Sequence, residues 1–366
     1  MTPARFDRRR LRFRPLAERK SKVVFPRDAV SPDAEPRKLA PPAEALLDET
    51  AERIMAARAA GRPVMLATGA HAIKNGLGPV LIALVRDGWL THLATNGAGI
   101  IHDWELAFQG ATSEDVRANI AIGEFGAWEE TGRLLNLGLL VGAYRGLGYG
   151  ASIGALIAEE GLDVPSRAEL ARAARSFASD AERASSAIDL LAALDEAAIP
   201  SGPMRVPHPG KQWSVQAAAW SLGVPFTGHP MIGHDIIYEH PLASGSAIGR
   251  TAMRDFLCFA EGVSRLSGGV YLSVGSAVMS PMVFEKSLSM ARNLALQRGE
   301  AIEDHYLLVA DLAPSTWNWA SDGEPPDDHP AYYQRYCKSF SRMGGTLRYL
   351  TADNRDLLLG LRRRLR

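Results

Sequence analysis

The residues best suited to chemistry lie in one short stretch, HLATNGAGIIHDWELAFQGATSEDV, at residues 92–116. His102 and Asp103 stand side by side in it, as a proton acceptor and a carboxylate able to orient it. A β-branched, alternating run ends at Thr95, two glycines with wide backbone freedom follow, and an apolar periodic pattern begins at Ile101. The stretch predicts a strand, a glycine turn and a helix that presents His102 and Asp103 as catalytic residues.

The start of such a helix attracts anions, because its N–H groups are unpaired and its dipole is positive there. We therefore expect this turn to bind a pyrophosphate or a carboxylate, through Thr95, Asn96, Gly97 and Gly99. The match to G-x-G-x-x-G is partial, since His102 takes the place of the last glycine. The alternative is structural, because acidic residues also stabilise helix starts by capping alone.

Two further glycine turns follow apolar strands, in ATGAHAIKNG at 67–76 and in GGVYLSVGSAVMSP at 268–281. The carboxyl ends of parallel strands line the ligand crevice of open α/β sheets, so both turns are placed to bind a cofactor. The alternative for the first turn is an ordinary polar surface loop. The cofactor-binding residues expected from these turns are Thr68, Asn75, Gly275, Ser276 and Ala277.

A histidine-rich loop, HPMIGHDIIYEHP at 229–241, is expected to contact the substrate through His234, Asp235 and Glu239. It contains no H-E-x-x-H motif, and spacings of five and six residues do not align histidines on one helix face. We therefore expect no metal, and histidines that hydrogen-bond or move protons in neutral form.

The segment SDGEPPDDHPAYYQRYCKSF, at 321–340, joins an acidic loop to an aromatic run. Lys338 stands among aromatic side chains, and a lysine desolvated in this way can act as a nucleophile or base. The alternative is that Lys338 extends along an aromatic surface into solvent. Asp322 is the residue of the loop expected to attract a cationic amine.

Apolar strand-like runs alternate with helical ones along the chain. The strand-like runs are 63–68, 91–95, 223–228, 268–278, 305–312 and 346–351, and helical runs include 79–86 and 281–298. This alternation predicts an α/β fold with a doubly wound, mostly parallel sheet and helices on both faces. Prolines and charges in residues 1–40 predict an extended basic arm, and residues 41–366 then form a single domain. The alanine-rich residues 151–198 predict a helical insertion in it.

The chain has 366 residues, with 41 basic and 41 acidic side chains and 46% hydrophobic residues. This balance excludes a general attraction to nucleic acids or membranes and makes a small molecule the default partner. Two cysteines without C-x-x-C spacing favour a reducing, cytoplasmic setting. We expect no export signal and no membrane anchor, and an arm that is solvated or packs on a neighbouring subunit.

The segment TGAHAIKNGLGPVLIALVRDGWLTHLATNGAGIIHDWE resembles the NAD-binding half of deoxyhypusine synthases, which carry similar turns in the same order. VPFTGHPMIGHDIIY and GGVYLSVGSAV resemble that family's substrate loop and second glycine turn, and Tyr336-Cys337-Lys338 is similar to its Trp-Gly-Lys site. The family's histidines after the second turn are replaced by Met279-Ser280-Pro281. NGAGIIHDWELAFQGATS is also similar to archaeal-type ornithine cyclodeaminases, whose pattern it matches more closely.

Both resemblances imply NAD as the cofactor and an amine as the substrate, a diamine, a polyamine or a basic amino acid. The cofactor would take a hydride from the amine-bearing carbon, and the imine would then be transferred or rearranged. They also imply a homo-oligomer, a dimer or tetramer. Three functions remain open: an aminoalkyl transferase of the deoxyhypusine synthase type, a cyclodeaminase-type lyase, and a non-catalytic NAD-binding protein.

Overall fold

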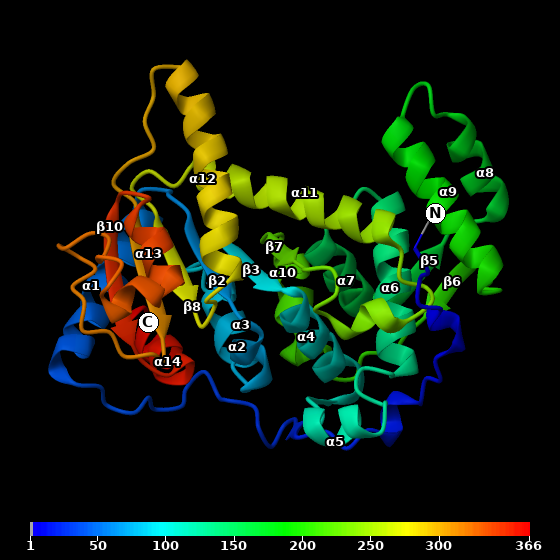
Figure 1. Cartoon of the computed structure of the whole chain (residues 1–366), viewed down its shortest axis with the longest axis horizontal. Helices are drawn as coiled ribbons and strands as arrows, with labels where there is room; N and C mark the ends of the chain where they lie inside the picture. The colour runs from blue at the N-terminus through cyan, green and yellow to red at the C-terminus, as the bar shows by residue number, and fades with distance from the viewer. Residues whose placement is uncertain (1–2) are drawn as a thin grey trace.

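The computed structural model describes residues 3–366, which are built around one six-stranded sheet (Figure 1). Every pairing in this sheet is parallel, and the strand order is β10-β9-β8-β2-β3-β7. Counted along the chain, the first strand lies between the second and the fourth, which is the doubly wound Rossmann arrangement. The predicted fold class is confirmed. The strands are β2 (Val64–Thr68), β3 (His92–Asn96), β7 (Phe226–His229), β8 (Val270–Val274), β9 (Tyr306–Asp311) and β10 (Thr346–Thr351).

Helices bury both faces of the sheet, so successive strand residues enter two separate cores. On β8, Leu272 packs with one cluster and its neighbour Tyr271 with the other. This explains why the strands read as continuous apolar runs rather than alternating ones. One face carries α11 (Gly245–Ser264), α12 (Met279–Gln297) and α13 (Arg335–Ser341); the other carries α1 (Pro41–Ala59), α3 (Gly78–Arg86) and α14 (Asn354–Arg364).

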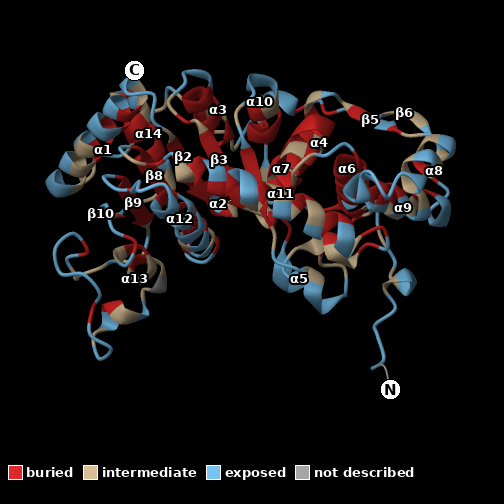
Figure 2. Ribbon diagram, turned by 90° about the horizontal axis from the view of Figure 1, so that it is seen from above, coloured by how far each residue is buried: buried red, intermediate tan, exposed pale blue. Residues whose placement is uncertain are grey.

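A helical region lies between β3 and β7 and is wider than the insertion expected at 151–198. Figure 1 shows its α8–α9 pair projecting on the same side as α12, with α11 running between them, and Figure 2 shows buried residues concentrated in its inner helices. Its elements are α4 (Gly97–Gln109), α5 (Val116–Ala121), α6 (Glu129–Tyr144), α7 (Tyr149–Ala158), β5 (Gly161–Val164), α8 (Arg167–Arg175), α9 (Ala181–Glu196), β6 (Gly202–Arg205) and α10 (Val215–Leu222).

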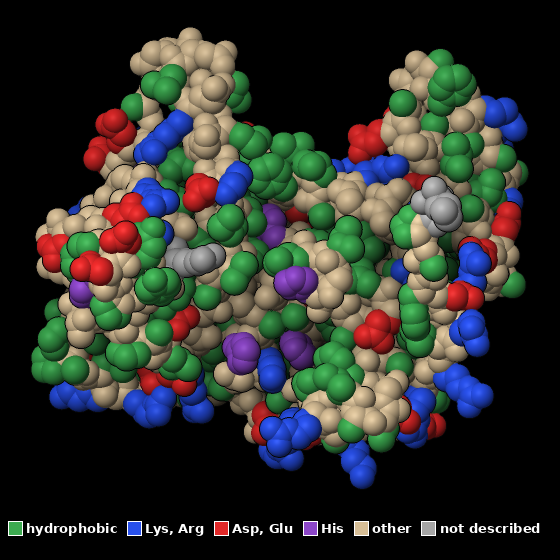
Figure 3. Space-filling view, in the orientation of Figure 1, with side chains coloured by type: hydrophobic (Ala, Val, Ile, Leu, Met, Phe, Trp, Pro, Cys, Tyr) green, Lys and Arg blue, Asp and Glu red, His purple; other side chains and the backbone are tan. Residues whose placement is uncertain are grey.

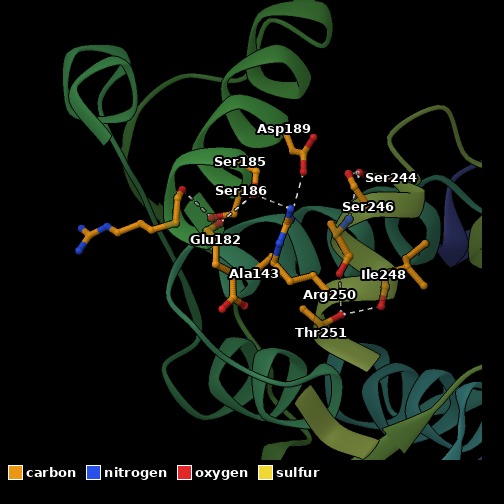
Figure 4. Close-up of polar contacts among 12 residues, drawn as sticks. Ala143, Glu182, Ser185, Ser186, Asp189, Ser244, Ser246, Ile248, Arg250 and Thr251 are labelled. Atoms are coloured by element: carbon orange, nitrogen blue, oxygen red, sulfur yellow. Dashed lines mark hydrogen bonds and ion pairs between the residues drawn. The ribbon is translucent and has the colours of Figure 1, made fainter. Parts of the chain in front are cut away.

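Polar contacts tie this region to α11. Arg250 of α11 donates hydrogen bonds to Asp189 Oδ2 at 3.1 Å and to Ser185 Oγ at 3.1 Å, both on α9 (Figure 4). Arg254, one turn further along α11, pairs with Glu182. These contacts fix the helices of the insertion against a helix that also packs on the sheet.

The N-terminal arm follows the surface of its own chain, and most of its side chains are exposed. Packing of the arm on a neighbouring subunit stays a prediction. Two short 3-10 turns, Arg8–Arg10 and Leu16–Glu18, precede β1 (Val23–Val24), which pairs antiparallel with β4 (Ala111–Thr112). The first long helix then begins at Pro41, close to the expected position. Among the described residues, no helix is both long and apolar enough to cross a membrane.

Two glycine turns meet where the strand order reverses, between β2 and β8. Gly69 follows β2 and leads into the short helix α2 (Ala70–Lys74), while Gly275 follows β8 with a φ of +57°. A Cβ at Gly69 would lie 2.2 Å from the Gly275 carbonyl oxygen. Because backbone carbonyls cannot move aside cheaply, only glycine fits at position 69.

We predict that Gly69→Ala lowers the free energy of unfolding by about 1 to 3 kcal/mol, the range for overpacked sites. Urea unfolding measures the change. Gly249→Ala is the matched control, because Gly249 is an exposed position of α11 with open space around it. That control should be neutral or stabilise by up to about 1 kcal/mol. Equal effects of the two changes would contradict the close approach of the turns.

Candidate functional site

The reversal of strand order places the two glycine turns at the position where doubly wound sheets bind ligands. Thr68 ends β2, and Gly275 and Ser276 follow β8 beside it. Ser276 is buried, and its Oγ accepts a hydrogen bond from the Ser280 N–H at the start of α12. Ala277 is exposed in the same turn, whereas Asn75 is exposed at the other end of α2. The structure thus brings together four of the five residues expected from these turns.

The turn after β3 is tight for a different reason from the one expected. Gly97 and Gly99 lie inside α4, which begins at Gly97 rather than near Ile101, and neither has a positive φ. A Cβ at Gly97 would meet Asp235 Oδ2 at 2.1 Å, and one at Gly99 would meet Thr95 Oγ1 at 2.2 Å. The glycines therefore provide space for neighbouring side chains, not special backbone angles.

Asp235 thus covers the helix start at which an anionic cofactor was expected. Asn96 caps this helix, its Oδ1 accepting from the Gly99 N–H at 3.0 Å. Thr95 donates to the Thr68 carbonyl oxygen at 3.0 Å and so ties β3 to β2. A pyrophosphate at Gly97 would have to displace a carboxylate, so the switch point between β2 and β8 is the better position for it.

A cavity of about 180 Å³ lies between the end of α2, the first turns of α4, the N-terminal arm and the loop after β7. Lys74 of α2 lines it, together with His102 of α4 and with His234 and Asp235 of the loop after β7. Glu239 lines a neighbouring hollow that shares His234 and Asp235 with the cavity. The structure therefore brings together one predicted catalytic residue and three of the four predicted substrate residues.

Asp235 is the carboxylate best placed to hold a cation in this cavity. It is mostly buried, and Oδ2 accepts a hydrogen bond from the Tyr238 hydroxyl at 3.0 Å. Burial raises the pKa of Asp235 to about 6, so it is ionised near neutral pH. Burial and the nearby Glu114 raise the pKa of Glu239 to about 7. A cationic ligand would relieve the unfavourable desolvation of both groups.

His102 is the candidate base. Burial lowers its pKa to about 4, which leaves the imidazole neutral at physiological pH. Its Nδ1 lies 2.7 Å from Thr112 Oγ1, and that hydroxyl donates to Glu105 Oε2 at 2.5 Å. Glu105 is buried and takes a bidentate ion pair from Arg19, with both contacts at 2.7 Å. Burial alone would raise the pKa of Glu105, but the charge and hydrogen bonds of Arg19 outweigh it and lower that pKa.

Sequence reasoning missed the roles of Arg19 and Glu105. Arg19 lies 86 residues before its partner, in an arm whose arginines look alike in sequence. Glu105 carried a detectable signal, because it lies three residues after His102 and such residues share a helix face. No local pattern marks Arg19, since its contact is made only by the path of the arm.

Three of the predicted catalytic and substrate residues line neither this cavity nor the neighbouring hollow. Asp103 is buried and accepts hydrogen bonds from the Ser214 hydroxyl and from the Val215 and Gln216 N–H groups at the start of α10. Asp103 thus stabilises the start of α10, whereas the structural alternative placed it at the start of its own helix, which Asn96 caps. The remaining two residues are Lys338, whose Nζ lies 3.2 Å from the Tyr332 ring centroid, and Asp322, which is exposed and bonded to the Ser321 hydroxyl.

Histidine side chains gather near the centre of the face shown in Figure 3, with a basic side chain between two of them. Among residues 3–366, no group of three or more His, Cys, Asp or Glu side chains is arranged to hold a metal ion. His92 and His229 are buried below the loop and share Thr227 Oγ1, at 3.1 and 3.0 Å. Burial lowers the pKa of both rings, so these histidines are neutral.

The sequence matches no protein-family model and no curated protein. Among solved structures, ArgZ, an arginine dihydrolase from the ornithine–ammonia cycle in cyanobacteria, is 14% identical with a TM-score of 0.42, covering 88% of this chain and 32% of that one. The complex of AgrE with ornithine and NAD+ is 13% identical with a TM-score of 0.46, covering 90% of this chain and 34% of that one.

A conserved putative LOR/SDH protein from Methanococcus maripaludis S2 is 11% identical with a TM-score of 0.42, covering 91% of this chain and 70% of that one. The chain spans about a third of the length of ArgZ and AgrE. The fold assignment rests on the order of its own strands. None of these three proteins is described as a deoxyhypusine synthase, so that resemblance stays a prediction.

The raised pKa of Asp235 predicts a pH-dependent difference in stability between the protein and its Asp235→Asn variant. An acid with a higher pKa in the folded chain holds its proton more tightly there. The stability of the wild type relative to the variant should therefore be full below about pH 4 and fall as the pH rises through about 6. We expect a loss of about 1 to 3 kcal/mol.

Urea unfolding of both proteins between pH 4 and pH 8 measures this difference. Comparing the two proteins removes the contribution of every other titrating group. A difference that stays constant over this range, or that grows with pH, would show that Asp235 is not held in a desolvated environment.

Proposed function

We propose that this chain is an NAD-dependent enzyme that oxidises the amine-bearing carbon of a small diamine, polyamine or basic amino acid. One observation carries the proposal: a neutral imidazole, His102, and a desolvated carboxylate, Asp235, line one cavity at the end of α2, the helix that starts from the switch point of a Rossmann-type sheet. These are the groups that amine oxidation by hydride transfer requires, a cation-binding carboxylate and a proton acceptor.

The cofactor would lie at the switch point, along the backbone of Gly69, Gly275 and Ser276. The position fits such a group because both turns follow the carboxyl ends of adjacent parallel strands, β2 and β8, where doubly wound sheets bind their cofactors. When bound, NAD supplies the hydride acceptor. Helix α2 starts at the switch point and ends at Lys74 in the cavity, so about 7 Å of helix joins the two places.

The substrate would lie in the cavity with its ammonium group near Asp235. Glu114 and Glu239 add negative charge to this side, whereas Lys74 provides a positive charge for a carboxylate. A volume of about 180 Å³ suits a compact amine or amino acid better than a long polyamine. The arrangement favours a molecule that carries both an ammonium and a carboxylate group.

His102 would remove the ammonium proton and so leave a neutral amine. The C–H electron pair would then leave with its hydrogen as a hydride, for which bound NAD would be the acceptor, and the nitrogen lone pair would form the new C=N bond of a protonated imine. Asp235 would stabilise the positive charge of the ammonium group before the proton leaves and that of the protonated imine after the hydride has left. The arm and α5 form one wall of the cavity, through Arg19 and Val116.

The placement of Lys338 bears on the choice between functions. Its amine lies over Tyr332 and 3.8 Å from Glu324, outside the cavity, so transfer of an aminoalkyl group to it has no support in the geometry. A cyclodeaminase-type lyase needs no such lysine and is the second candidate. A non-catalytic NAD-binding protein is the third, because Met279-Ser280-Pro281 supplies no histidine at the second turn.

Calorimetric titration with NAD, after removal of any copurified nucleotide, tests the cofactor. We expect saturable binding to the wild type and weaker binding to Ser276→Trp, whose side chain would fill the turn after β8. Circular dichroism checks that the variant is folded. Absence of binding to the folded wild type would remove the proposed function and leave the fold.

Turnover of amines and basic amino acids, followed as NADH absorbance in single-turnover mixtures, tests the base. His102→Gln should lower the rate about 10²-fold or more, the contribution usual for general-base catalysis, with little change in NAD affinity. Lys338→Ala is the matched control and should leave the rate unchanged. Loss of activity in Lys338→Ala, or full activity in His102→Gln, would contradict this assignment of the site.

A further inference from the structure

A chain of hydrogen bonds leads from His102 to the N-terminal arm. His102 Nδ1 lies 2.7 Å from Thr112 Oγ1, and Thr112 Oγ1 lies 2.5 Å from Glu105 Oε2. The other oxygen of Glu105 accepts from the Thr131 hydroxyl at 2.9 Å, and Arg19 donates to both oxygens. An ionised carboxylate is an acceptor only, so all these partners must donate to it.

This arrangement leaves one consistent placement of protons. Thr112 has a single hydroxyl proton, and it donates this proton in its hydrogen bond to Glu105. The Thr112 oxygen must then accept from His102, so the imidazole carries its proton on Nδ1. If Nδ1 were bare instead, the Thr112 proton would turn to it, and a hydroxyl oxygen would face a carboxylate oxygen at 2.5 Å with no proton between them. That alternative leaves a buried acceptor pair unsatisfied.

The arm holds both ends of this chain. Arg19 supplies the charge that keeps Glu105 ionised, and the side chains of the pair are only 2% and 1% exposed. The register of β1 with β4 pairs Val23 with Thr112. On either side, the Lys22 N–H donates to Ser113 and the Phe25 N–H to Gly110. The backbone that carries Thr112 is therefore fixed by the arm itself.

We propose that Arg19 and Thr112 are positioning residues that set the tautomer of His102, with the proton on Nδ1 and the lone pair of Nε2 available to the cavity. The N-terminal arm is then part of the catalytic machinery rather than a tail. The catalytic consequence rests on the proposed function, whereas the tautomer is a property of the folded protein and can be measured without turnover.

Nitrogen-15 NMR of the histidine rings tests this proposal, because the protonated and bare ring nitrogens differ widely in chemical shift. Comparison with His102→Gln assigns the signals of His102. We expect the wild type to carry the proton on Nδ1. Thr112→Ser keeps the hydroxyl and should keep this tautomer, whereas Thr112→Val has the same shape without the hydroxyl and should shift the proton toward Nε2.

Thr112→Val should also lower the amine-dependent rate about 10²-fold, and Thr112→Ser should restore most of it. Arg19→Gln is a second variant, although it leaves a buried carboxylate uncompensated and can unfold the protein. The two variants Thr112→Ser and Thr112→Val change no charge, and their comparison therefore decides the question. The unfolding midpoints of both variants show whether a lower rate comes from a misplaced His102 or from a less stable fold.

A proton on Nε2 in the wild type, or the same tautomer in Thr112→Val as in the wild type, would overturn the proposal. If the tautomer changes as expected while the protein neither binds NAD nor oxidises amines, the proposed function fails and the inferred proton placement stands. If the folded Thr112→Val protein shows the shifted tautomer but keeps full turnover, the positioning role is wrong.

Discussion

The arrangement around the cavity depends on one buried ion pair, between Arg19 and Glu105. A carboxylate inside a protein is strongly unfavourable unless it is paired and fully hydrogen-bonded, and Glu105 meets this requirement with a guanidinium and two hydroxyl groups. The guanidinium comes from the N-terminal arm, so the pair fixes the path of the arm together with the backbone bonds of Arg14 to Ala127 and Glu129. The pairing of β1 with β4 and the wall of the cavity follow from that path.

The two carboxylates Glu105 and Asp235 lie in different electrostatic environments. Glu105 is neutralised by Arg19 inside the protein, while Asp235 faces the cavity with only the Tyr238 hydroxyl as a side-chain donor. Only the second carboxylate is therefore free to attract a cation. The Rossmann-type sheet supplies the frame for this division, because parallel strands deliver the turns after β2, β3 and β7 to one edge. At this edge the short helix α2 spans one to two helical turns between the switch point and the cavity.

Local patterns in the sequence predicted most of the fold and part of the site. Apolar runs located all six strands of the sheet, and three of the polar residues that follow those runs, His102, His234 and Asp235, line one cavity. Lys338 was misplaced because an aromatic environment is shared by surface and site lysines. Arg19 was missed because long-range pairing has no local signature, and one arginine among many cannot be distinguished by composition.

The pattern His102-Asp103-Trp104-Glu105 shows how a small error of position alters a functional interpretation. The sequence pattern placed the start of the helix near Ile101 and favoured the adjacent His102 and Asp103 as one catalytic pair. In the structure the helix begins at Gly97, and both residues lie well inside it. Successive helical residues are rotated by about 100°, so His102 and Asp103 point in different directions, whereas residues three apart, such as His102 and Glu105, share a face. Asp103 then faces α10 and caps it, whereas Glu105 lies beneath His102. The helical period therefore assigns the orienting carboxylate to Glu105, with Thr112 as the link between the two side chains.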